Sequence, residues 1–472
     1  MGDITGFIKV KRKEAGNRLI NERICDHSEV EQVLNSEDRM LQASRCMDCG
    51  IPFCHWICPV DNLIPEWNDL LFKGEWKAAY ERLIATNNFP EITGRICPAL
   101  CEHSCVLNIG QEPVTIRENE VAIAERAFNE GYVKPCVPLK RTGKRVAVIG
   151  SGPSGLAAAD LLNKSGHTVT LFEKDEKPGG LMRFGIPDFK LSKAVIDRRI
   201  NLMLKEGLIL RARTLIGRDI TVNELLSGYD AICIAIGCSH PRNLEIEGRS
   251  LNGIHFAMDF LSNQNRINAG DLHPSENWIS AENKRVLVVG GGDTGSDCVG
   301  TAIRQKALNV TQIEILPKPP VVRNPDNPWP FYGKILKTST SHEEGCERLW
   351  SVSTIRFIGT DGNLKGAEVE DVAWEIENDK YIMKPIPGSQ RIIETDFVLL
   401  ALGFVHPVLD GLIYGLNTEL DDRKNIKIDG SFMTSIPKVF AAGDSVSGAS
   451  LVVNAIASGR KAAKEIDRFL RS

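Results

Sequence analysis

Short apolar runs alternate with helical stretches along most of the chain after residue 140. The first two runs are Arg145–Ile149 and Thr168–Phe172, and a helix beginning at Leu156 separates them. Further runs of this kind are Tyr229–Gly237, Lys284–Val289, Val310–Leu316, Asp396–Phe404 and Lys438–Asp444. Uninterrupted apolar runs are typical of strands buried on both faces of a parallel sheet. The pattern predicts an α/β fold.

The first two runs enclose a glycine-rich turn and are followed by an acidic residue, Glu173. The turn matches G-x-G-x-x-G through Gly150, Gly152, Pro153, Ser154 and Gly155. In a dinucleotide site the glycines form the turn, let backbone approach a pyrophosphate and let helix pack on strand, while the acid binds a ribose. The segment predicts such a site; the alternative is a tight turn in an ordinary α/β domain.

A second copy of this pattern follows Lys284–Val289. Its turn contains Gly290, Gly292, Asp293, Thr294 and Gly295, and Glu314 lies in the next strand. One copy for a flavin and one for a nicotinamide is the simplest interpretation, although both could bind one type of nucleotide. An acid at Glu314 favours the free 2′-hydroxyl of NADH, whereas Lys318 and Arg323 leave the 2′-phosphate of NADPH open.

Other positions of the strand ends and the loops after them fit close contact with a flavin. These are Gly180, Leu181, Gly237, Gly443, Asp444, Leu451 and Val452. Adjacent glycines allow backbone to approach a ring, an acid can bind a ribityl hydroxyl, and a helix N-terminus can support the pyrimidine edge. We expect the chain to leave the flavin domain after Gly237 and to return after Gly403.

Seven of the thirteen cysteines lie between residues 46 and 105, in two groups. The first group is Cys46, Cys49, Cys54 and Cys58, and the second is Cys97, Cys101 and Cys105; proline follows Cys58 and Cys97. This resembles the ferredoxin pattern of iron–sulfur ligands, with zinc and free thiols as alternatives. Two sets of four need an eighth ligand, for which the candidates are His55, His103, Glu112, Glu118 and Glu120.

Three other segments have weaker patterns. Residues 1–40 are expected to form an extended arm or loosely packed helices, and Ile64–Ala85 has helical periodicity. Pro317–Pro330 is expected to be a structured loop over the nicotinamide domain. A net charge of −4 gives no sign of nucleic acid or anionic membrane as a partner, and we expect the protein in the cytoplasm, since no apolar run is long enough to span a bilayer and no signal peptide is evident.

Taken together, these motifs resemble the family of glutamate synthase small (beta) subunits along nearly the whole chain. The resemblance rests on the two cysteine groups, the first glycine-rich turn, Gly179–Pro187, Gly290–Thr294 and Ala441–Asp444. It implies FAD, a nicotinamide site and two 4Fe-4S clusters. It assigns one cluster to Cys46, Cys49, Cys54 and Cys105, and the other to Cys58, Cys97, Cys101 and Glu120.

The resemblance also implies an architecture and a role. It divides the chain into a helical iron–sulfur domain (1–140), an FAD domain (141–243 and 404–472) and an inserted NAD(P)H domain (244–403). Electrons would pass from NAD(P)H through FAD and the clusters to a large subunit that makes glutamate from glutamine and 2-oxoglutarate, with no side chain as a general acid or base. Alternatives are a dihydropyrimidine dehydrogenase or ferredoxin partner, or a non-enzymatic zinc-binding assembly subunit. Ile315-Leu316, where NADPH-dependent members carry arginines, favours NADH.

Overall fold

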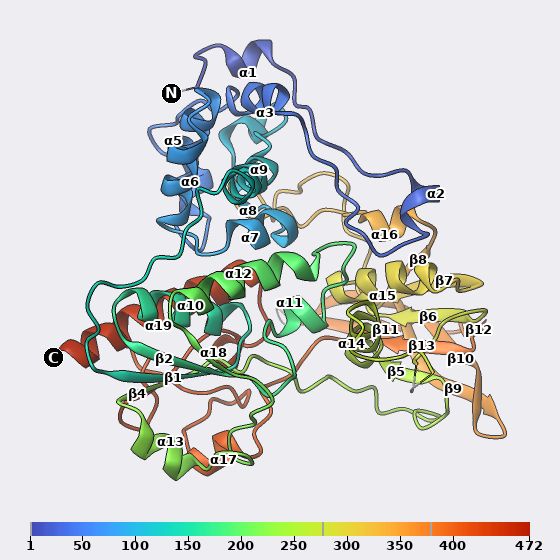
Figure 1. Ribbon diagram of the computed structural model, residues 1–472. Helices are drawn as coiled ribbons and strands as arrows, with labels where there is room; N and C mark the ends of the chain where they lie inside the picture. The colour runs from blue at the N-terminus through green and yellow to red at the C-terminus, as the bar shows by residue number, and fades with distance from the viewer. Residues whose placement is uncertain (1, 276–277, 378–379) are drawn as a thin grey trace.

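The computed structural model, which describes residues 2–275, 278–377 and 380–472, has a helical N-terminal region and two α/β units (Figure 1). In Figure 1 the helical region lies above the first α/β unit, and the second α/β unit lies to the right. The helical region contains α1 (Gly6–Lys9), α2 (Ile20–Arg23), α3 (Ser36–Ala43), α4 (Phe53–Trp56), α5 (Ile64–Phe72), α6 (Trp76–Ile84), α7 (Pro90–Ile96), α8 (Leu100–His103), η1 (Val106–Ile109) and α9 (Ile116–Asn129).

The helical periodicity predicted over Ile64–Ala85 corresponds to two helices, α5 and α6. The break falls at Gly74, whose φ of +74° is in the left-handed region and ends the first helix. Both helices turn their apolar side chains inward, so that Trp67 and Leu71 are fully buried. These side chains pack in one core with Cys46 and Cys105.

The first α/β unit is built on one parallel sheet with strand order β14-β4-β1-β2-β3. Helices α10 and α19 lie side by side against it, and their contact requires glycine, because a Cβ on Gly459 would stand 2.1 Å from the oxygen of Ser154. The unit contains β1 (Arg145–Ile149), α10 (Pro153–Lys164), β2 (Thr168–Phe172), α11 (Leu181–Phe184), α12 (Lys193–Lys205), β3 (Ile209–Arg211), α13 (Val222–Gly228), β4 (Ala231–Ile234), α17 (Leu412–Leu416), β14 (Val439–Ala441), α18 (Asp444–Ser447) and α19 (Val452–Arg471).

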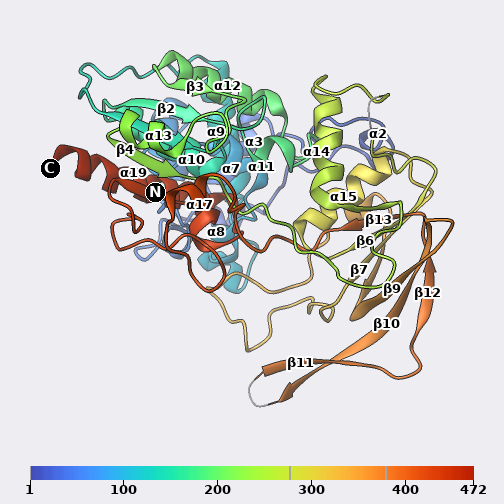
Figure 2. The ribbon, with the colours of Figure 1, turned by 90° about the horizontal axis from the view of Figure 1, so that it is seen from below.

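The second α/β unit interrupts the first between β4 and β14 and has its own parallel sheet, β5-β13-β6-β7-β8. Antiparallel strands β9 to β12 extend from it, and Figure 2 shows the β10–β11 hairpin projecting from the body. The unit contains β5 (Ile254–Phe256), α14 (Ala257–Asn268), β6 (Arg285–Val289), α15 (Asp293–Arg304), β7 (Asn309–Glu314), α16 (Thr340–Glu343), β8 (Glu347–Trp350), β9 (Val352–Thr360), β10 (Asn363–Glu377), β11 (Lys380–Pro385), β12 (Arg391–Glu394) and β13 (Phe397–Leu400).

The fold class is therefore the predicted one: a helical N-terminal region followed by two Rossmann-like units, the second inserted in the first. The two segments that connect the units pair with each other. The backbone N–H of His240 donates to the oxygen of His406 at 3.0 Å, and that of Val405 donates to the oxygen of His240 at 2.9 Å. No helix within the described residues is both long and apolar enough to cross a membrane.

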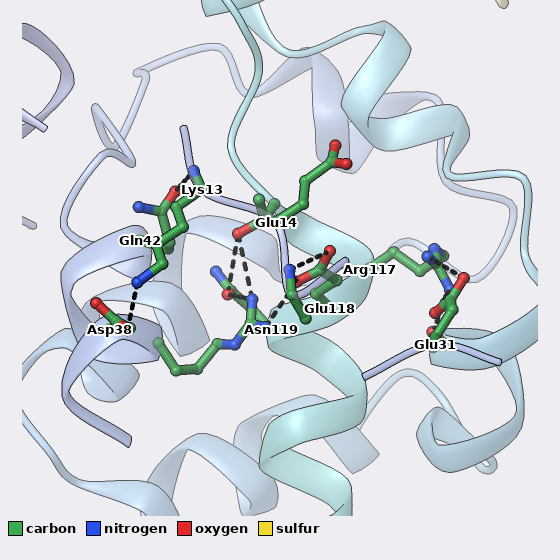
Figure 3. A network of polar contacts seen from close by, with 12 residues as sticks. Lys13, Glu14, Glu31, Asp38, Gln42, Arg117, Glu118 and Asn119 are labelled. Carbon is green, nitrogen blue, oxygen red and sulfur yellow. Dashed lines mark hydrogen bonds and ion pairs between the residues drawn. The ribbon is translucent and has the colours of Figure 1, made fainter. Parts of the chain in front are cut away.

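Residues 2–40, predicted as an extended arm or helices, contain both: residues 10–35 form an arm that is extended apart from α2, and α1 and the start of α3 lie on either side of it. The arm is fixed to the helical region by charged contacts, including Lys13 with Asp38 at 2.7 Å and Arg117 with Glu31 at 2.7 Å (Figure 3). Its middle, which carries α2, crosses to α16 of the second α/β unit (Figure 1). The arm therefore connects the helical region to the second α/β unit.

Candidate functional site

The first glycine-rich turn is closed so tightly that two of its glycines have no space for a side chain. Gly150 has a φ of +98°, and a Cβ there would stand 2.4 Å from the oxygen of Ala235. A Cβ on Gly155 would stand 1.9 Å from the oxygen of Gly150, whereas the space beside Gly152 is open. The buried hydroxyl of Ser154 has no hydrogen-bond partner among the described residues. This open helix N-terminus fits a dinucleotide pyrophosphate.

The second glycine-rich turn repeats this geometry at the start of α15. Gly290 has a φ of +120°, and a Cβ there would stand 2.3 Å from a backbone oxygen of the neighbouring strand end. A Cβ on Gly295 would stand 2.2 Å from the oxygen of Gly290, and the space beside Gly292 is again open. Asp293 and Thr294 form the first turn of the helix. The structure thus brings both predicted turns into a form that can hold a dinucleotide.

The two predicted ribose-binding acids occupy equivalent positions, each at the end of a second strand and beside a turn. Glu173 accepts hydrogen bonds from the backbone N–H of Ser151 at 3.1 Å and of the residue two positions after itself at 2.9 Å. Glu314 accepts the corresponding bonds from Gly291 at 2.6 Å and from the residue two positions after itself at 2.9 Å. These bonds hold each carboxylate at the edge where a ribose would lie.

The other predicted flavin contacts gather at the carboxyl ends of β1, β4 and β14. Gly180 passes so close to the first turn that a Cβ on it would stand 2.9 Å from the Cα of Gly152. Asp444 begins α18 and accepts a hydrogen bond from the hydroxyl of Ser450 at 2.6 Å, and burial raises the pKa of its carboxyl. The remaining members of this group are Gly237 after β4, Gly443 before α18, and Leu181 and Leu451-Val452 at the starts of α11 and α19. Gly403, by contrast, follows β13 in the second unit.

Of the two cations that left the coenzyme open, Lys318 lies over Trp350, the β8 residue paired with Glu314 of β7, whereas Arg323 is engaged away from Glu314. The ammonium of Lys318 lies 4.9 Å from the centre of the Trp350 ring. Arg323 donates to the backbone oxygen of Phe331 at 2.6 Å and to that of His103 at 3.1 Å. Phe331 lies in the same loop as Arg323, and His103 lies in the helical region. The guanidinium of Arg323 is therefore held away from Glu314.

A polar network behind the second turn was missed by the sequence analysis. Gln312 donates to the oxygen of Gly290 at 2.8 Å, and its own oxygen lies 2.8 Å from Nε2 of His342. Burial, followed by the charges of Arg348 and Lys190, lowers the pKa of His342 to about 4. In the sequence, the only sign of this network was the polar residue Gln312 within the apolar run of β7.

The seven clustered cysteines and Glu120 separate into two groups in space. Cys46, Cys49, Cys54 and Cys105 line one cavity together with apolar side chains of α4, α5 and η1. Burial raises the pKa of Cys46 to about 12, and the nearby thiols of Cys105 and Cys49 add to the increase. This is the grouping that the resemblance implied for the first cluster.

The second group is formed by Cys58, Cys97, Cys101 and Glu120. Burial raises the pKa of Cys97 to about 11 and of Cys58 to about 12, and in both cases the carboxylate of Glu120 contributes. Burial also raises the pKa of Cys101 well above its ordinary value, and Glu102, Cys97, Cys58 and Glu120 add to the increase. Among the described residues, no three His, Cys, Asp or Glu side chains are close enough together to hold a single metal ion. The ligands of a cluster of several irons do not need to be that close together.

Among the five candidates for an eighth ligand, Glu120 differs in its surroundings. Its carboxylate is buried, and it accepts hydrogen bonds from Asn62 at 3.1 Å, from Asn87 at 3.2 Å and from Thr93. Burial raises the pKa of Glu120 to about 7. Glu112 is exposed, Glu118 is paired with Arg39 at 2.6 Å, and His103 packs on the ring of Tyr332.

The two groups also differ in what they pack against. Cys58 and Cys97 contact the core of the first α/β unit, which includes Val148 and Leu156. Cys46 and Cys105 are buried in the separate core of the helical region. Cys101 of the second group also packs against the helical-region core, so the second group lies between that core and the first α/β unit, and the first group lies farther out.

Two dinucleotide-binding turns on Rossmann-like units define the class of pyridine-nucleotide flavoprotein oxidoreductases. In agreement, the family profile of pyridine nucleotide-disulphide oxidoreductases matches residues 144–459, and that of dihydropyrimidine dehydrogenase domain II, 4Fe-4S cluster, matches residues 23–132. FprA from Mycobacterium tuberculosis has the same fold, with a TM-score of 0.55 and 17% identity over 70% of this chain and 85% of that chain.

More similar relatives narrow this class. A glutamate synthase [NADPH] small chain of Mycobacterium tuberculosis is 48% identical over 100% of this chain and 96% of its own length. The glutamate synthase [NADH] of Schizosaccharomyces pombe is 44% identical over 98% of this chain. The matched part makes up 22% of the length of that relative. The chain belongs to the family of glutamate synthase small chains.

Proposed function

We propose that this chain is the electron-input subunit of a glutamate synthase. It oxidises NAD(P)H at FAD and passes the electrons through two 4Fe-4S clusters to a large subunit, which makes L-glutamate from L-glutamine and 2-oxoglutarate. Residues 1–140 would hold the clusters, residues 141–243 and 404–472 the FAD, and residues 244–403 the nicotinamide nucleotide. We propose the cytoplasm as its location, a reducing compartment that keeps cysteines available as metal ligands.

The observation that carries this proposal is the separation of the eight candidate ligands, which are buried or half-buried, into two groups between the flavin-type turn and the outer side of the helical region. Bound FAD would supply the step from a two-electron hydride to single electrons. The chain's own residues bind and orient: Glu173 and the first turn would hold the flavin nucleotide, and Glu314 and the second turn the nicotinamide nucleotide. Burial of the cysteines keeps water from the route.

We propose NADH as the preferred coenzyme. The carboxylate of Glu314 would meet a 2′-phosphate with like charge, whereas it can accept a hydrogen bond from a free 2′-hydroxyl. Arg323 is engaged elsewhere, and the ammonium of Lys318 lies over the ring of Trp350, the β8 neighbour of Glu314. The Schizosaccharomyces pombe relative is named for NADH, while the name of the Mycobacterium tuberculosis relative specifies NADPH, so the choice needs a direct measurement.

The proposal is tested on protein purified anaerobically, by measuring iron, sulfide and flavin and by following reduction of an acceptor dye with NADH and with NADPH. We expect iron, sulfide and FAD to be present and NADH to have the higher kcat/KM. Formation of glutamate from glutamine and 2-oxoglutarate is not expected from this chain alone. Zinc in place of iron, or no flavin, would overturn the electron-transfer role, and a higher kcat/KM with NADPH would overturn the coenzyme preference.

A variant tests the proposed eighth ligand. Glu120→Gln keeps the shape of the side chain but removes its charge, so we expect the protein to lose about half of its iron and to keep its flavin. Glu112→Gln, at an exposed acid in the same segment, serves as the control and should retain full iron. Full iron content in Glu120→Gln would show that another residue completes the second group.

A further inference from the structure

A loop of the second α/β unit, residues 317–338, reaches the helical region beside the first cysteine group. The indole N–H of Trp329 donates to the backbone oxygen of Cys105 at 3.3 Å. The Trp329 ring packs on that of Phe53, with the ring centres 4.6 Å apart, and Phe53 directly precedes Cys54. The sequence predicted a structured loop over the nicotinamide domain, but its tip lies against the proposed ligand Cys105 and against Phe53, which precedes the proposed ligand Cys54.

Further contacts fix the tip on both sides of Trp329. The hydroxyl of Ser104 donates to the backbone oxygen of Pro330, and Arg323 donates to the oxygen of His103 at 3.1 Å. The ring of Tyr332 packs on that of His103, with centres 4.5 Å apart. The His103–Cys105 segment is therefore covered by side chains and backbone from a different unit.

The loop also has its own internal framework. The buried side chain of Asn327 donates to the oxygen of Tyr332 at 3.1 Å and accepts from the backbone N–H of Lys334 at 2.6 Å. At the base of the loop, the N–H of Leu336 donates to the oxygen of Pro320 at 2.8 Å. A loop held in this way can present Trp329 in one fixed position.

The base of the loop lies at the nicotinamide-type turn. The loop begins just after Glu314, whose carboxylate is bound to Gly291. It ends before Ser339, whose hydroxyl lies 2.6 Å from that of Ser296 on α15. One continuous segment thus runs from the proposed nucleotide site to the proposed cluster site.

We infer that Trp329 is a positioning residue that forms the outer wall of the first cluster site, so that the second α/β unit completes this site. Trp329 holds the Cys105 backbone and, with Phe53, keeps water away from the Cys54 and Cys105 thiolates. Solvent exposure and hydrogen bonding around the ligands help to set the reduction potential and lability of a 4Fe-4S cluster. This inference rests on the proposed iron–sulfur function.

The test compares Trp329→Ala, Trp329→Phe and the control Trp374→Phe in the full-length protein loaded with its cofactors. Trp374 makes the same kind of bond, from its indole N–H to the oxygen of Ile315 at 2.8 Å, but lies on β10. The measurements are the rate of iron release to a chelator and the midpoint potentials of the clusters, followed by electron paramagnetic resonance. Flavin content reports whether the rest of the protein is intact.

We expect Trp329→Ala to release about half of the iron roughly tenfold faster or more, the range found when supporting residues of metal sites are removed. One midpoint potential should move upward, because water stabilises the more negative reduced cluster. Trp329→Phe keeps the ring and should lie between Trp329→Ala and wild type. If both variants release iron like Trp374→Phe and keep both potentials, the inference is wrong. Wild-type protein without iron would instead overturn the proposed function.

If Trp329→Ala does not fold, Trp329→Phe still decides the question. This variant loses the indole N–H and with it the hydrogen bond to the backbone oxygen of Cys105. We expect this loss alone to shift the same midpoint potential and to increase the rate of iron release. An unchanged potential and release rate in Trp329→Phe, together with failure of Trp329→Ala to fold, would limit Trp329 to a structural role and overturn the inference.

Discussion

Single residues at the two turns act mainly by orienting backbone. Glu173 and Glu314 each accept hydrogen bonds from two backbone N–H groups, which fixes the position of the carboxylate. Behind the second turn, His342 and Gln312 perform a similar task for Gly290. His342 is partly buried and lies near cationic side chains. The hydrogen bonding behind the second turn therefore depends on whether His342 is protonated.

The stability of the protein should depend on pH through His342. Its folded-state pKa of about 4 lies below the ordinary value of 6.5, so the folded state resists protonation. The stabilisation is complete above pH 6.5 and is lost as pH falls toward 4, by about 1 to 2 kcal/mol after allowance for solvent screening. We expect the free energy of unfolding of wild type to fall more steeply over this range than that of His342→Gln. Parallel curves would contradict the prediction.

At the scale of single elements, α7 connects the first α/β unit to the second cysteine group. Near its start, the carboxylate of Glu91 accepts two hydrogen bonds from Arg199 of α12, at 2.6 and 2.9 Å. At its end, Cys97 follows as the C-cap residue. Both charged side chains are almost completely buried, so this short helix is held rigidly on the flavin-type unit.

Removing one member of this pair should be strongly destabilising. Glu91→Gln leaves the Arg199 charge buried without a full partner, which we expect to cost about 3 to 5 kcal/mol in the free energy of unfolding. The double variant Glu91→Gln/Arg199→Met should recover part of this loss. Chemical denaturation followed by circular dichroism and flavin absorbance measures both.

An exposed ion pair provides the control for this measurement. Arg82 and Glu66 in the helical region are each about half exposed, so Arg82→Ala should cost less than about 1 kcal/mol. If Glu91→Gln is no more destabilising than Arg82→Ala, the buried pair does not hold α7 on the first α/β unit.

On the scale of the whole molecule, two connections run from the helical region to the second α/β unit: the 317–338 loop and the N-terminal arm. In the arm, Arg23 donates to Glu344 at 2.8 Å and to the oxygen of Thr340 at 2.8 Å. Glu344 is almost fully buried and also accepts from Arg304. The arm and the loop therefore hold the second unit against the cluster region from two sides (Figure 1).

Loss of Arg23 should release the arm without removing any cofactor. In Arg23→Met, Glu344 remains paired with Arg304, so the cost is that of the lost charge-assisted bonds, about 1 to 3 kcal/mol. We expect amide hydrogen exchange in residues 18–30 to accelerate by about tenfold or more, with iron and flavin contents unchanged. The control is Arg18→Met, whose partner Asp26 lies within the arm. Equal exchange in both variants would mean that Arg23 does not anchor the arm.

The sequence by itself determined both turns, the residue types of the sites and seven parallel strands, which are β1, β2, β4, β6, β7, β13 and β14. It did not predict the antiparallel strands β9 to β12. Apolar runs long enough for a strand leave few alternatives to a parallel sheet, and the turns need glycine because a Cβ at Gly150 or Gly290 would collide with backbone. The acids at the strand ends follow from the same local pattern. The break at Gly74 was missed because the helical periodicity continues across it.

Only the tertiary structure decided which residues meet. Cysteine spacing names the ligands but cannot pair Cys58 with Cys97 or Cys54 with Cys105, because such groupings depend on how α4, α7 and α9 pack. The same holds for Trp329 on Cys105 and for Arg23 on Glu344, which lie far apart in the chain. Local sequence preferences act over a few residues, whereas these contacts exist only after the helical region and both α/β units have packed together.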